Sequence, residues 1–199
     1  MDSNNQNWES QYEFQKKYSS IECFFSKFHI GTILNNCGIR KLKGASPLTI
    51  MTSIFSLAFT GKNFFRGIVK NDEKPFGKDA AYEFLKSPVY NWRKVILMLG
   101  FQIFSFMNKL TGESRENVLI FDETPMDKSR SKKVELLAKV YDHAQNKFIK
   151  GFRMLTVCWS DGSSLIPLDF AILSSRNKKN RIQGIEKKLD KRTCGYKRR

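Results

Sequence analysis

The sequence predicts an α+β fold in which a helical N-terminal region precedes a β-sheet. From residue 46 to about residue 110, apolar residues recur at the three- and four-residue spacing of amphipathic helices. From residue 118 onward, short apolar and β-branched runs alternate with turn residues, as they do in strands. We therefore expect a helical domain over 1–112, a sheet domain over 113–175 and a basic tail over 176–199.

The N-terminal segment begins polar and then becomes apolar in the stretch SSIECFFSKFHIGTILNNCG. Apolar side chains have helical spacing here, at Ile21, Phe24, Phe25 and Phe28. Gly31 and Gly38 interrupt the pattern, so we expect one or two short helices.

Four more helices are expected before the sheet. Ser46 followed by Pro47 is typical of a helix start, and Gly61 of a helix end, which predicts a helix over 48–58. The other three are expected over 62–69, 78–86 and 90–110. The last is apolar on nearly all sides, as a central helix would be.

The strands follow in the second half of the chain. The run VLIFD, at 118–122, has the continuous apolar character of a buried strand. Two further strands joined by the turn Ser160-Asp161-Gly162 predict a hairpin, with an edge or a bulge at Pro167. For the segment 126–146, two interpretations stay open: a helix presenting Val134, Leu137, Ala138 and Tyr141, or a loop lying on the sheet.

The charge of the chain points to a polyanionic partner. Lys and Arg total 35 against 19 acids, for a formal net charge of +16. Nucleic acid is the first expectation and an anionic membrane the second, while a basic surface that binds nothing is the alternative. The longest apolar stretch is too short and too interrupted to span a bilayer, so no membrane partner is expected. The tail carries 11 basic residues and 2 acids, which predicts a solvated or disordered segment or a basic arm.

Cysteine and histidine usage argues against a zinc site. The four cysteines are widely spaced, no Cys-x-x-Cys pair exists, and only two histidines are present. Reduced thiols in a cytosolic protein are the default expectation. The polar N-terminus does not look like a signal peptide.

The apolar run at 118–121 is followed directly by two acidic residues, Asp122 and Glu123, and this placement needs an explanation. One interpretation is a turn, in which Asp122 and Thr124 cap backbone groups and Pro125 helps to reverse the chain. The other is a metal ligand, because Mg²⁺ prefers hard carboxylate oxygens and a strand fixes them rigidly. Composition alone leaves the two open.

A longer pattern favours the metal ligand. VLIFDETPMDKSRSKKVELLAKVYDH, followed by KGFRMLTVCWSDGSSLIPLDFAILSS, resembles the start of the catalytic domain of bacterial insertion-sequence transposases of the DDE type. The resemblance covers about residues 75–199 and implies the first strands of a ribonuclease H-like mixed sheet. It implies that Asp122 is the first catalytic, metal-binding acid, and that Mg²⁺ or Mn²⁺ serves the complete enzyme. Glu123 is not expected to be the principal ligand.

The resemblance also implies acids that this sequence does not supply. A DDE site needs a second Asp at the end of a later strand and a Glu on a following helix, and in the family both lie beyond the equivalent of Arg199. The remaining candidates are Asp142, Asp161, which we expect to serve the hairpin turn, and Asp169, which could point to either face. We therefore expect a truncated transposase that does not cut DNA by itself.

Within the helical region, the stretch GKDAAYEFLKSPVYNWRKVILML resembles the amino-terminal domain of the same transposases. Short helices followed by a longer one also suit a helix-turn-helix-like module. The alternative is an ordinary solvated helix face. Likewise, the cations of the loop at 128–133 suit either an approaching scissile phosphate or solvent. The DNA-contacting residues expected from these segments are Lys78, Tyr82, Lys86, Arg93, Lys94, Arg130, Lys132 and Lys133.

The function expected is binding of transposon-end and target double-stranded DNA, with strand cutting and joining by the complete enzyme. A homodimer in a synaptic complex and a cytoplasmic, nucleoid-associated location in a bacterium go with that expectation. One alternative is a non-catalytic DNA-binding protein or regulator derived from a transposase. Another is a basic RNA-associated protein, which lacks support from ribonucleoprotein-type motifs.

Overall fold

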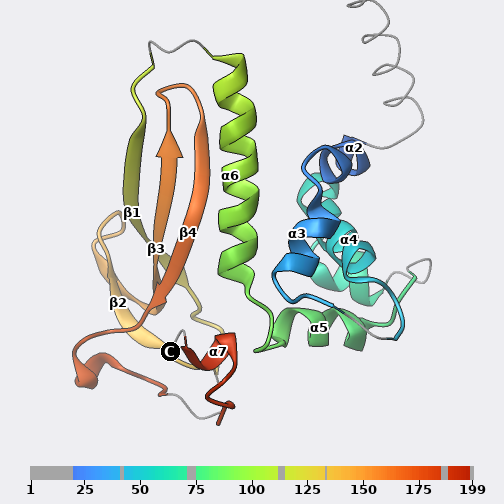
Figure 1. The fold of residues 1–199 in the computed structure, drawn as a ribbon. Helices are drawn as coiled ribbons and strands as arrows, with labels where there is room; N and C mark the ends of the chain where they lie inside the picture. Colours follow the sequence, from blue (N-terminus) through green and yellow to red (C-terminus); the bar gives the residue numbers. More distant parts are fainter. Residues whose placement is uncertain are drawn as a thin grey trace, which may run out of the picture. The chain divides into compact units, whose positions relative to one another are not determined.

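The structure, a computed structural model, describes residues 20–40, 43–70, 75–111, 115–132, 134–184 and 188–197. The chain forms two compact units, one comprising Met1–Val95 with Lys191–Arg199 and the other Ile96–Asp190. The predicted domain limits at residues 112 and 175 remain predictions, because a packing unit is not by itself a domain that folds alone. Figure 1 shows the elements of each unit.

The first unit is helical, as predicted. Its N-terminal part contains α2 (Ser20–Lys27), α3 (Ile30–Asn36) and α4 (Pro47–Thr60). The side chain of Ser46 accepts a hydrogen bond from the backbone N–H of Thr49 at 3.0 Å, and Gly61 closes α4 with a φ of 63°. Both predicted ends of α4 are therefore confirmed. The core of this part is apolar and includes Phe25, Ile33, Leu34 and Ile50.

One predicted helix has a different form. Residues Phe65–Val69 make a single π-helical turn, η1, in place of an α-helix over 62–69. Gly67 is buried in this turn, and a Cβ there would collide with the side chain of Leu57 on α4. α5 (Lys78–Lys86) has the predicted bounds, and α7 (Cys194–Lys197) follows near the C-terminus, where Gly195 donates its N–H to the carbonyl of Pro88.

The second unit contains an antiparallel sheet of four strands: β1 (Val118–Asp127), β2 (Ala138–Asp142), β3 (Lys147–Ser160) and β4 (Leu165–Leu173). β3 is the central strand. β1 pairs with residues 151–160 of β3 along one side, whereas β2 and β4 pair with β3 at residues 147–151 and 153–160. Helices followed by this sheet confirm the α+β class.

The β3–β4 hairpin is confirmed, with the predicted turn at its tip, where Gly162 has a φ of 85°. The register shifts by one residue between Val157 and Cys158, because Pro167 pairs with Cys158 and Asp169 with Val157. Leu168 is therefore bulged beside Pro167, which has no N–H to donate to a ladder.

The segment 126–146 is neither the predicted helix nor a loop throughout, because Ala138–Asp142 forms strand β2. Ala138, Val140 and Asp142 are buried while Lys139 is exposed, which is the alternation of a strand with one covered face. The turn into β3 uses Asn146 at a φ of 49°, a conformation that Asn tolerates well.

Helix α6 (Trp92–Leu110) lies along one face of the sheet over the part that belongs to the second unit (Figure 1). The ring of Phe104 on α6 contacts that of Trp159 on β3, with centroids 4.9 Å apart at 82°. Gly100 permits this close approach, because a Cβ there would lie 2.9 Å from the side chain of Leu168. The face of β3 that carries Trp159 is therefore the face that α6 covers.

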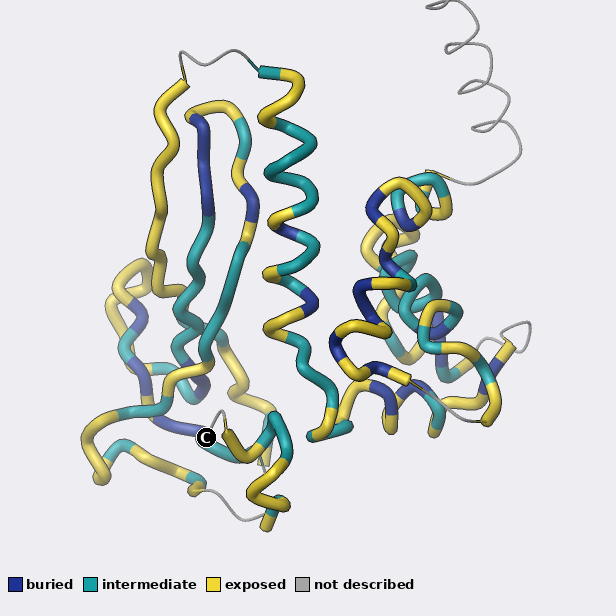
Figure 2. The backbone as a smooth tube through the Cα atoms, viewed as in Figure 1, coloured by how far each residue is buried: buried dark blue, intermediate teal, exposed yellow. Residues whose placement is uncertain are grey.

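The prediction that VLIFD is buried is wrong. Val118, Leu119, Ile120 and Phe121 are 41–65% exposed, and Figure 2 shows β1 exposed along most of its length. Among the residues that the structure describes, β1 pairs only with β3, so its outer edge carries no strand. An edge strand leaves apolar side chains exposed that a central strand would bury.

The part of the basic tail that the structure describes packs against β2. A short 3₁₀ helix, η2 (Lys178–Asn180), precedes Arg181, which forms an isolated bridge with Ala138. The N–H groups of Ile182 and Gln183 both donate to the carbonyl of Leu137, at 2.8 and 3.1 Å. Tail residues 178–183 thus border β2 on the side away from β3.

Candidate active site and nucleic-acid interface

Asp122 lies in the middle of β1, directly across from Thr156 of β3. The prediction that the strand ends at this acid is wrong, because β1 continues through Thr124 and Pro125 to Asp127. Pro125 is tolerated because β1 lies at an edge of the described sheet. The hydroxyl of Thr124 donates to Oδ2 of Asp122 at 3.0 Å. Asp122 is therefore not a turn cap.

Register assigns Asp122 to the face of the sheet that α6 does not cover. Directly paired strand residues share a face, and side chains alternate between faces along each strand. Asp122 pairs with Thr156, whereas Leu119 pairs with Trp159, the ring that meets α6. The carboxylate of Asp122 is exposed on the open face, where a ligand from solution can reach it.

Glu123 points to the other face. Its Oε1 lies 3.1 Å from a guanidinium nitrogen of Arg153, and both side chains remain more than a third exposed. The adjacent carboxylates of the Asp-Glu pair thus have separate surroundings, one bonded to a threonine hydroxyl and one to an arginine.

Asp161 serves the hairpin turn, as predicted. Its carboxylate accepts hydrogen bonds from Arg115 at 2.8 Å and from the N–H groups of Ser163 and Ser164 at 3.0 and 2.6 Å. The Arg115 guanidinium, followed by the backbone donors, lowers the pKa of Asp161 to about 2. These bonds make Asp161 a structural acid.

The other two acids do not join Asp122. Asp142 is buried at the β2–β3 turn, where it accepts hydrogen bonds from the N–H groups of Ala144 and Gln145. Asp169 pairs with Val157, which lies on the α6 side of β3, so Asp169 and Asp122 occupy opposite faces.

The open face therefore offers one carboxylate toward a divalent metal. Over the described ranges, no group of three His, Cys, Asp or Glu side chains is placed to hold a metal ion. Asp122 with Thr124 has the oxygen chemistry that Mg²⁺ or Mn²⁺ prefers, but a single carboxylate is not a complete site. The described residues thus fit one ligand of such a centre and not the whole of it.

The predicted DNA-contacting residues of the first unit are all exposed at the surface. Lys78, Tyr82 and Lys86 lie along α5, where the Lys86 ammonium is 5.1 Å from the centre of the Tyr82 ring. Arg93 and Lys94 lie in the first turn of α6. Nζ of Lys94 donates to the carbonyl of Asn36 at 3.1 Å, so Lys94 also caps the C-terminus of α3.

The cations of the second unit lie on the loop after β1. Arg130 and Lys132 are exposed there, and Lys133 lies outside the described residues. The N–H of Lys128 donates to the carbonyl of Lys150 at 2.8 Å, which fixes the start of the loop to β3. The structure does not place Asp122 and these cations in direct contact through any hydrogen bond or ion pair of the described residues.

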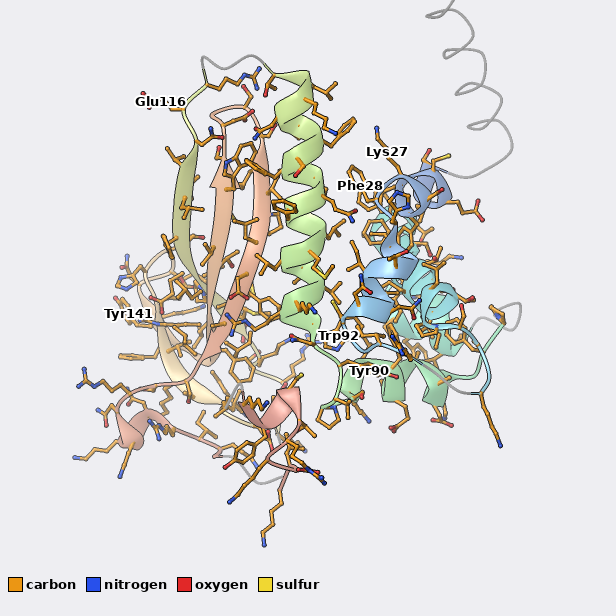
Figure 3. All side chains as sticks on the ribbon, viewed as in Figure 1. Lys27, Phe28, Tyr90, Trp92, Glu116 and Tyr141 are labelled. Carbon is orange, nitrogen blue, oxygen red and sulfur yellow. The ribbon has the colours of Figure 1, made fainter. Side chains whose placement is uncertain are left out.

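A basic and aromatic surface that sequence reasoning missed lies on the β2–β3 hairpin. Lys139 pairs with Lys150, and Tyr141 pairs with Phe148, so all four share one face. Figure 3 labels Tyr141 at this end of the sheet. The alternation in Ala138-Lys139-Val140-Tyr141-Asp142 was the available signal, but only a helix or a loop on the sheet was considered for this segment.

Among the helices in the described part of the chain, none is long and apolar enough to cross a membrane. A family model described as DDE superfamily endonuclease matches residues 57–197, well over half of the sequence. No curated protein and no solved structure matches the chain.

Proposed function

Because the chain belongs to the DDE superfamily of endonucleases, a family that acts on DNA with divalent metal ions, we propose that it is a transposase of an insertion sequence. In this proposal the chain binds double-stranded DNA at transposon ends and at the target. Mg²⁺ or Mn²⁺ would supply the Lewis-acid chemistry of strand cutting and joining. The chain's own contribution is a positioned carboxylate and basic surfaces.

The observation that carries the proposal is the setting of Asp122. The residue is fixed by the β1–β3 ladder, its carboxylate is oriented by the Thr124 hydroxyl, and its face of the sheet is the one that α6 leaves open. A rigid strand holds a ligand oxygen more closely in place than a loop would. We assign Asp122 the role of first metal ligand on this basis.

Basic side chains on both units support contact with DNA. Lys78, Lys86 and Arg93 are exposed on α5 and α6, and Arg130 and Lys132 are exposed on the loop after β1. These side chains would contact phosphate oxygens, which fixes register without reading sequence. A helix-turn-helix role for the α5 region and a synaptic homodimer belong to the same proposal.

Paramagnetic Mn²⁺ tests the role of Asp122 without requiring activity. In a two-dimensional amide spectrum, millimolar Mn²⁺ should broaden the resonances of residues 120–124 and 155–157. The broadening should disappear in Asp122→Asn and persist in Glu123→Gln, which removes the neighbouring charge on the other face. Equal broadening in Asp122→Asn and the wild type would overturn the assignment.

A non-catalytic regulator derived from a transposase is the second candidate. It is favoured by the finding that no three candidate ligands come together in the described residues. A plasmid-nicking assay in Mg²⁺ separates the two candidates. The regulator predicts duplex binding without nicking, whereas nicking that is lost in Asp122→Ala would contradict the regulator and support the transposase.

A further inference from the structure

The β2–β3 hairpin carries three rings that are linked through Tyr141, which is half-buried, whereas His143 and Phe148 are exposed. Tyr141 and Phe148 face each other across the strands, with centroids 5.2 Å apart at 70°. His143, just beyond β2, meets the Tyr141 ring edge to face at 5.0 Å. We call Tyr141, His143 and Phe148 the aromatic cluster. Phe148 is 65% exposed, so the cluster offers ring surface to a ligand rather than to the core.

The other face of the same hairpin already provides the packing. Ala138, Val140 and Asp142 alternate with the exposed residues of β2 and are buried. Stability of the hairpin is thus supplied from the covered face, and core packing does not account for the rings on the open face. An exposed aromatic group on a half-covered hairpin is a feature of binding surfaces.

Two lysines form the next pair on the same face, two positions along the ladder from Tyr141 and Phe148. Lys139 and Lys150 are direct cross-strand partners on the face of the aromatic cluster. Like charges placed directly opposite each other destabilise a sheet. Within the described residues neither lysine forms an ion pair with a carboxylate. An anion bound between them would remove this repulsion.

More cations border the hairpin on both sides. On one side, Lys128 is hydrogen-bonded through its N–H to Lys150. On the other side, the tail packs against β2 through Arg181 and Ile182, which brings the η2 residues Lys178 and Lys179 to the border of the hairpin. These cations border the two strands that carry the aromatic cluster.

We propose that the aromatic cluster stacks against unpaired bases of single-stranded DNA while Lys139 and Lys150 contact the adjoining phosphates. Exposed rings interleaved with cations are the arrangement by which proteins hold single strands, because every base presents a π face once it is unpaired. In a duplex the bases are stacked on one another, so a duplex would use the lysines but not the rings. The choice of DNA over RNA rests on the proposed function.

The hairpin and Asp122 share one face of the sheet. Lys150 and Thr156, the partner of Asp122, lie six positions apart on β3, which corresponds to roughly 20 Å along the strand. A few nucleotides of an extended strand span that distance. The proposal therefore deepens the proposed function by assigning a place for a strand that has separated from its complement near the candidate metal ligand.

The test measures binding of the full chain to a fluorescein-labelled oligothymidylate of about 15 nucleotides and to a duplex of equal length. Phe148→Leu keeps apolar bulk on the hairpin but removes the ring. We expect it to weaken oligothymidylate binding about tenfold and to leave duplex binding unchanged. Phe121→Leu is the matched control, because Phe121 is also 65% exposed but lies on the opposite face of β1.

Two further measurements separate the contributions of rings and charges. Phe148→Trp should retain affinity, and its indole fluorescence should be quenched by the oligothymidylate. Lys139→Gln with Lys150→Gln should reduce the salt dependence of single-strand binding by about 0.7 in log K per log salt for each phosphate that the variant no longer neutralises. Circular dichroism confirms that each variant is folded.

The outcomes distinguish this inference from the proposed function. Equal affinities of Phe148→Leu and Phe121→Leu for oligothymidylate would overturn the stacking site, whatever the duplex result. Tighter binding of oligouridylate RNA than of oligothymidylate would overturn the choice of DNA. If the wild type does not bind the duplex but binds the oligothymidylate in a way that depends on Phe148, the result would count against the proposed function alone.

Discussion

Asp161 illustrates how the role of one acid can be predicted from sequence and then defined by structure. The motif Ser160-Asp161-Gly162 predicted a turn, and the carboxylate caps that turn through the N–H groups of Ser163 and Ser164. The salt bridge to Arg115 could not be predicted, because Arg115 lies 46 positions earlier in the sequence and meets Asp161 only through the fold.

Substitution of Asp161 by Asn should lower the free energy of unfolding in a pH-dependent way. The pKa of Asp161 falls from 3.8 to about 2 on folding, so its contribution is fully present above about pH 4. That contribution is lost as the pH falls toward 2, where the folded carboxyl takes up its proton. Urea unfolding of wild type and Asp161→Asn between pH 7 and pH 2 should therefore give curves that converge at low pH.

Arg115→Gln provides the companion to this experiment. It removes the principal cause of the lowered pKa of Asp161 while leaving the backbone donors in place. It should therefore lower the free energy of unfolding by part of the amount that Asp161→Asn does. The double variant should lose less than the sum of the two single variants, because both remove one shared interaction. A stability difference between wild type and Asp161→Asn that stays constant with pH would contradict the account.

Among the elements, β1 shows which properties of a strand cannot be predicted from its local sequence. Its existence was predicted from Val118-Leu119-Ile120-Phe121, but its length and exposure were not. A proline commonly ends a strand, and Pro125 suggested such an end. Whether a strand is an edge depends on which strands lie beside it, and that is a property of the whole sheet.

The helices were easier to predict because their signals are local. Ser46, Pro47 and Gly61 identified both ends of α4 from single residues. By contrast, β2 was missed because it is only five residues long, a length at which helical and strand periods are hard to tell apart. The metal-ligand interpretation of Asp122 also needed a longer pattern than the local residues, and it stays a prediction.

The exposed edge of β1 should make the chain prone to self-association. Among the described residues no strand pairs with the outer edge of β1, and a long apolar edge of this kind is a template for pairing with another chain. Replacing Ile120 by Lys should reduce light scattering on concentration, with unfolding free energy within about 0.5 kcal/mol of the wild type, because exposed positions tolerate substitution.

Phe59→Lys is the control for this prediction. Phe59 is 68% exposed near the C-terminus of α4, so its substitution changes net charge and exposed apolar area without altering a strand edge. Equal suppression of scattering by both variants would mean that net charge, rather than the β1 edge, governs association.

At the scale of the whole molecule, a net charge of +16 predicts how the proposed binding of DNA depends on salt. Phosphate contacts release counterions, so the affinity for duplex DNA should fall steeply with salt. Lys78→Gln with Lys86→Gln should reduce the slope of log K against log salt by about 0.9 for each phosphate left without its cation. Arg130→Gln with Lys132→Gln tests the second unit in the same way.

Lys109→Gln serves as the control for charge alone, since Lys109 lies in the last turn of α6, outside both predicted contact groups. Equal reductions in slope per removed charge from every variant would indicate a diffuse electrostatic effect. A reduction confined to one pair would identify the unit that contacts duplex DNA. Fluorescence anisotropy over a salt series provides the measurement.

The bulge at Leu168 has a consequence for the balance of charge across the sheet. Its extra residue reverses the odd-even order of side chains along β4, so Ile166 and Asp169 both lie on the side that α6 covers. In an unbroken ladder, Asp169 would instead stand beside Thr156, one strand away from Asp122, and the two negative groups would repel an incoming strand together. Because of the bulge, the paired positions of the face that α6 does not cover carry one acid, Asp122, and two lysines, Lys139 and Lys150. A polyanion can approach this face with little electrostatic repulsion.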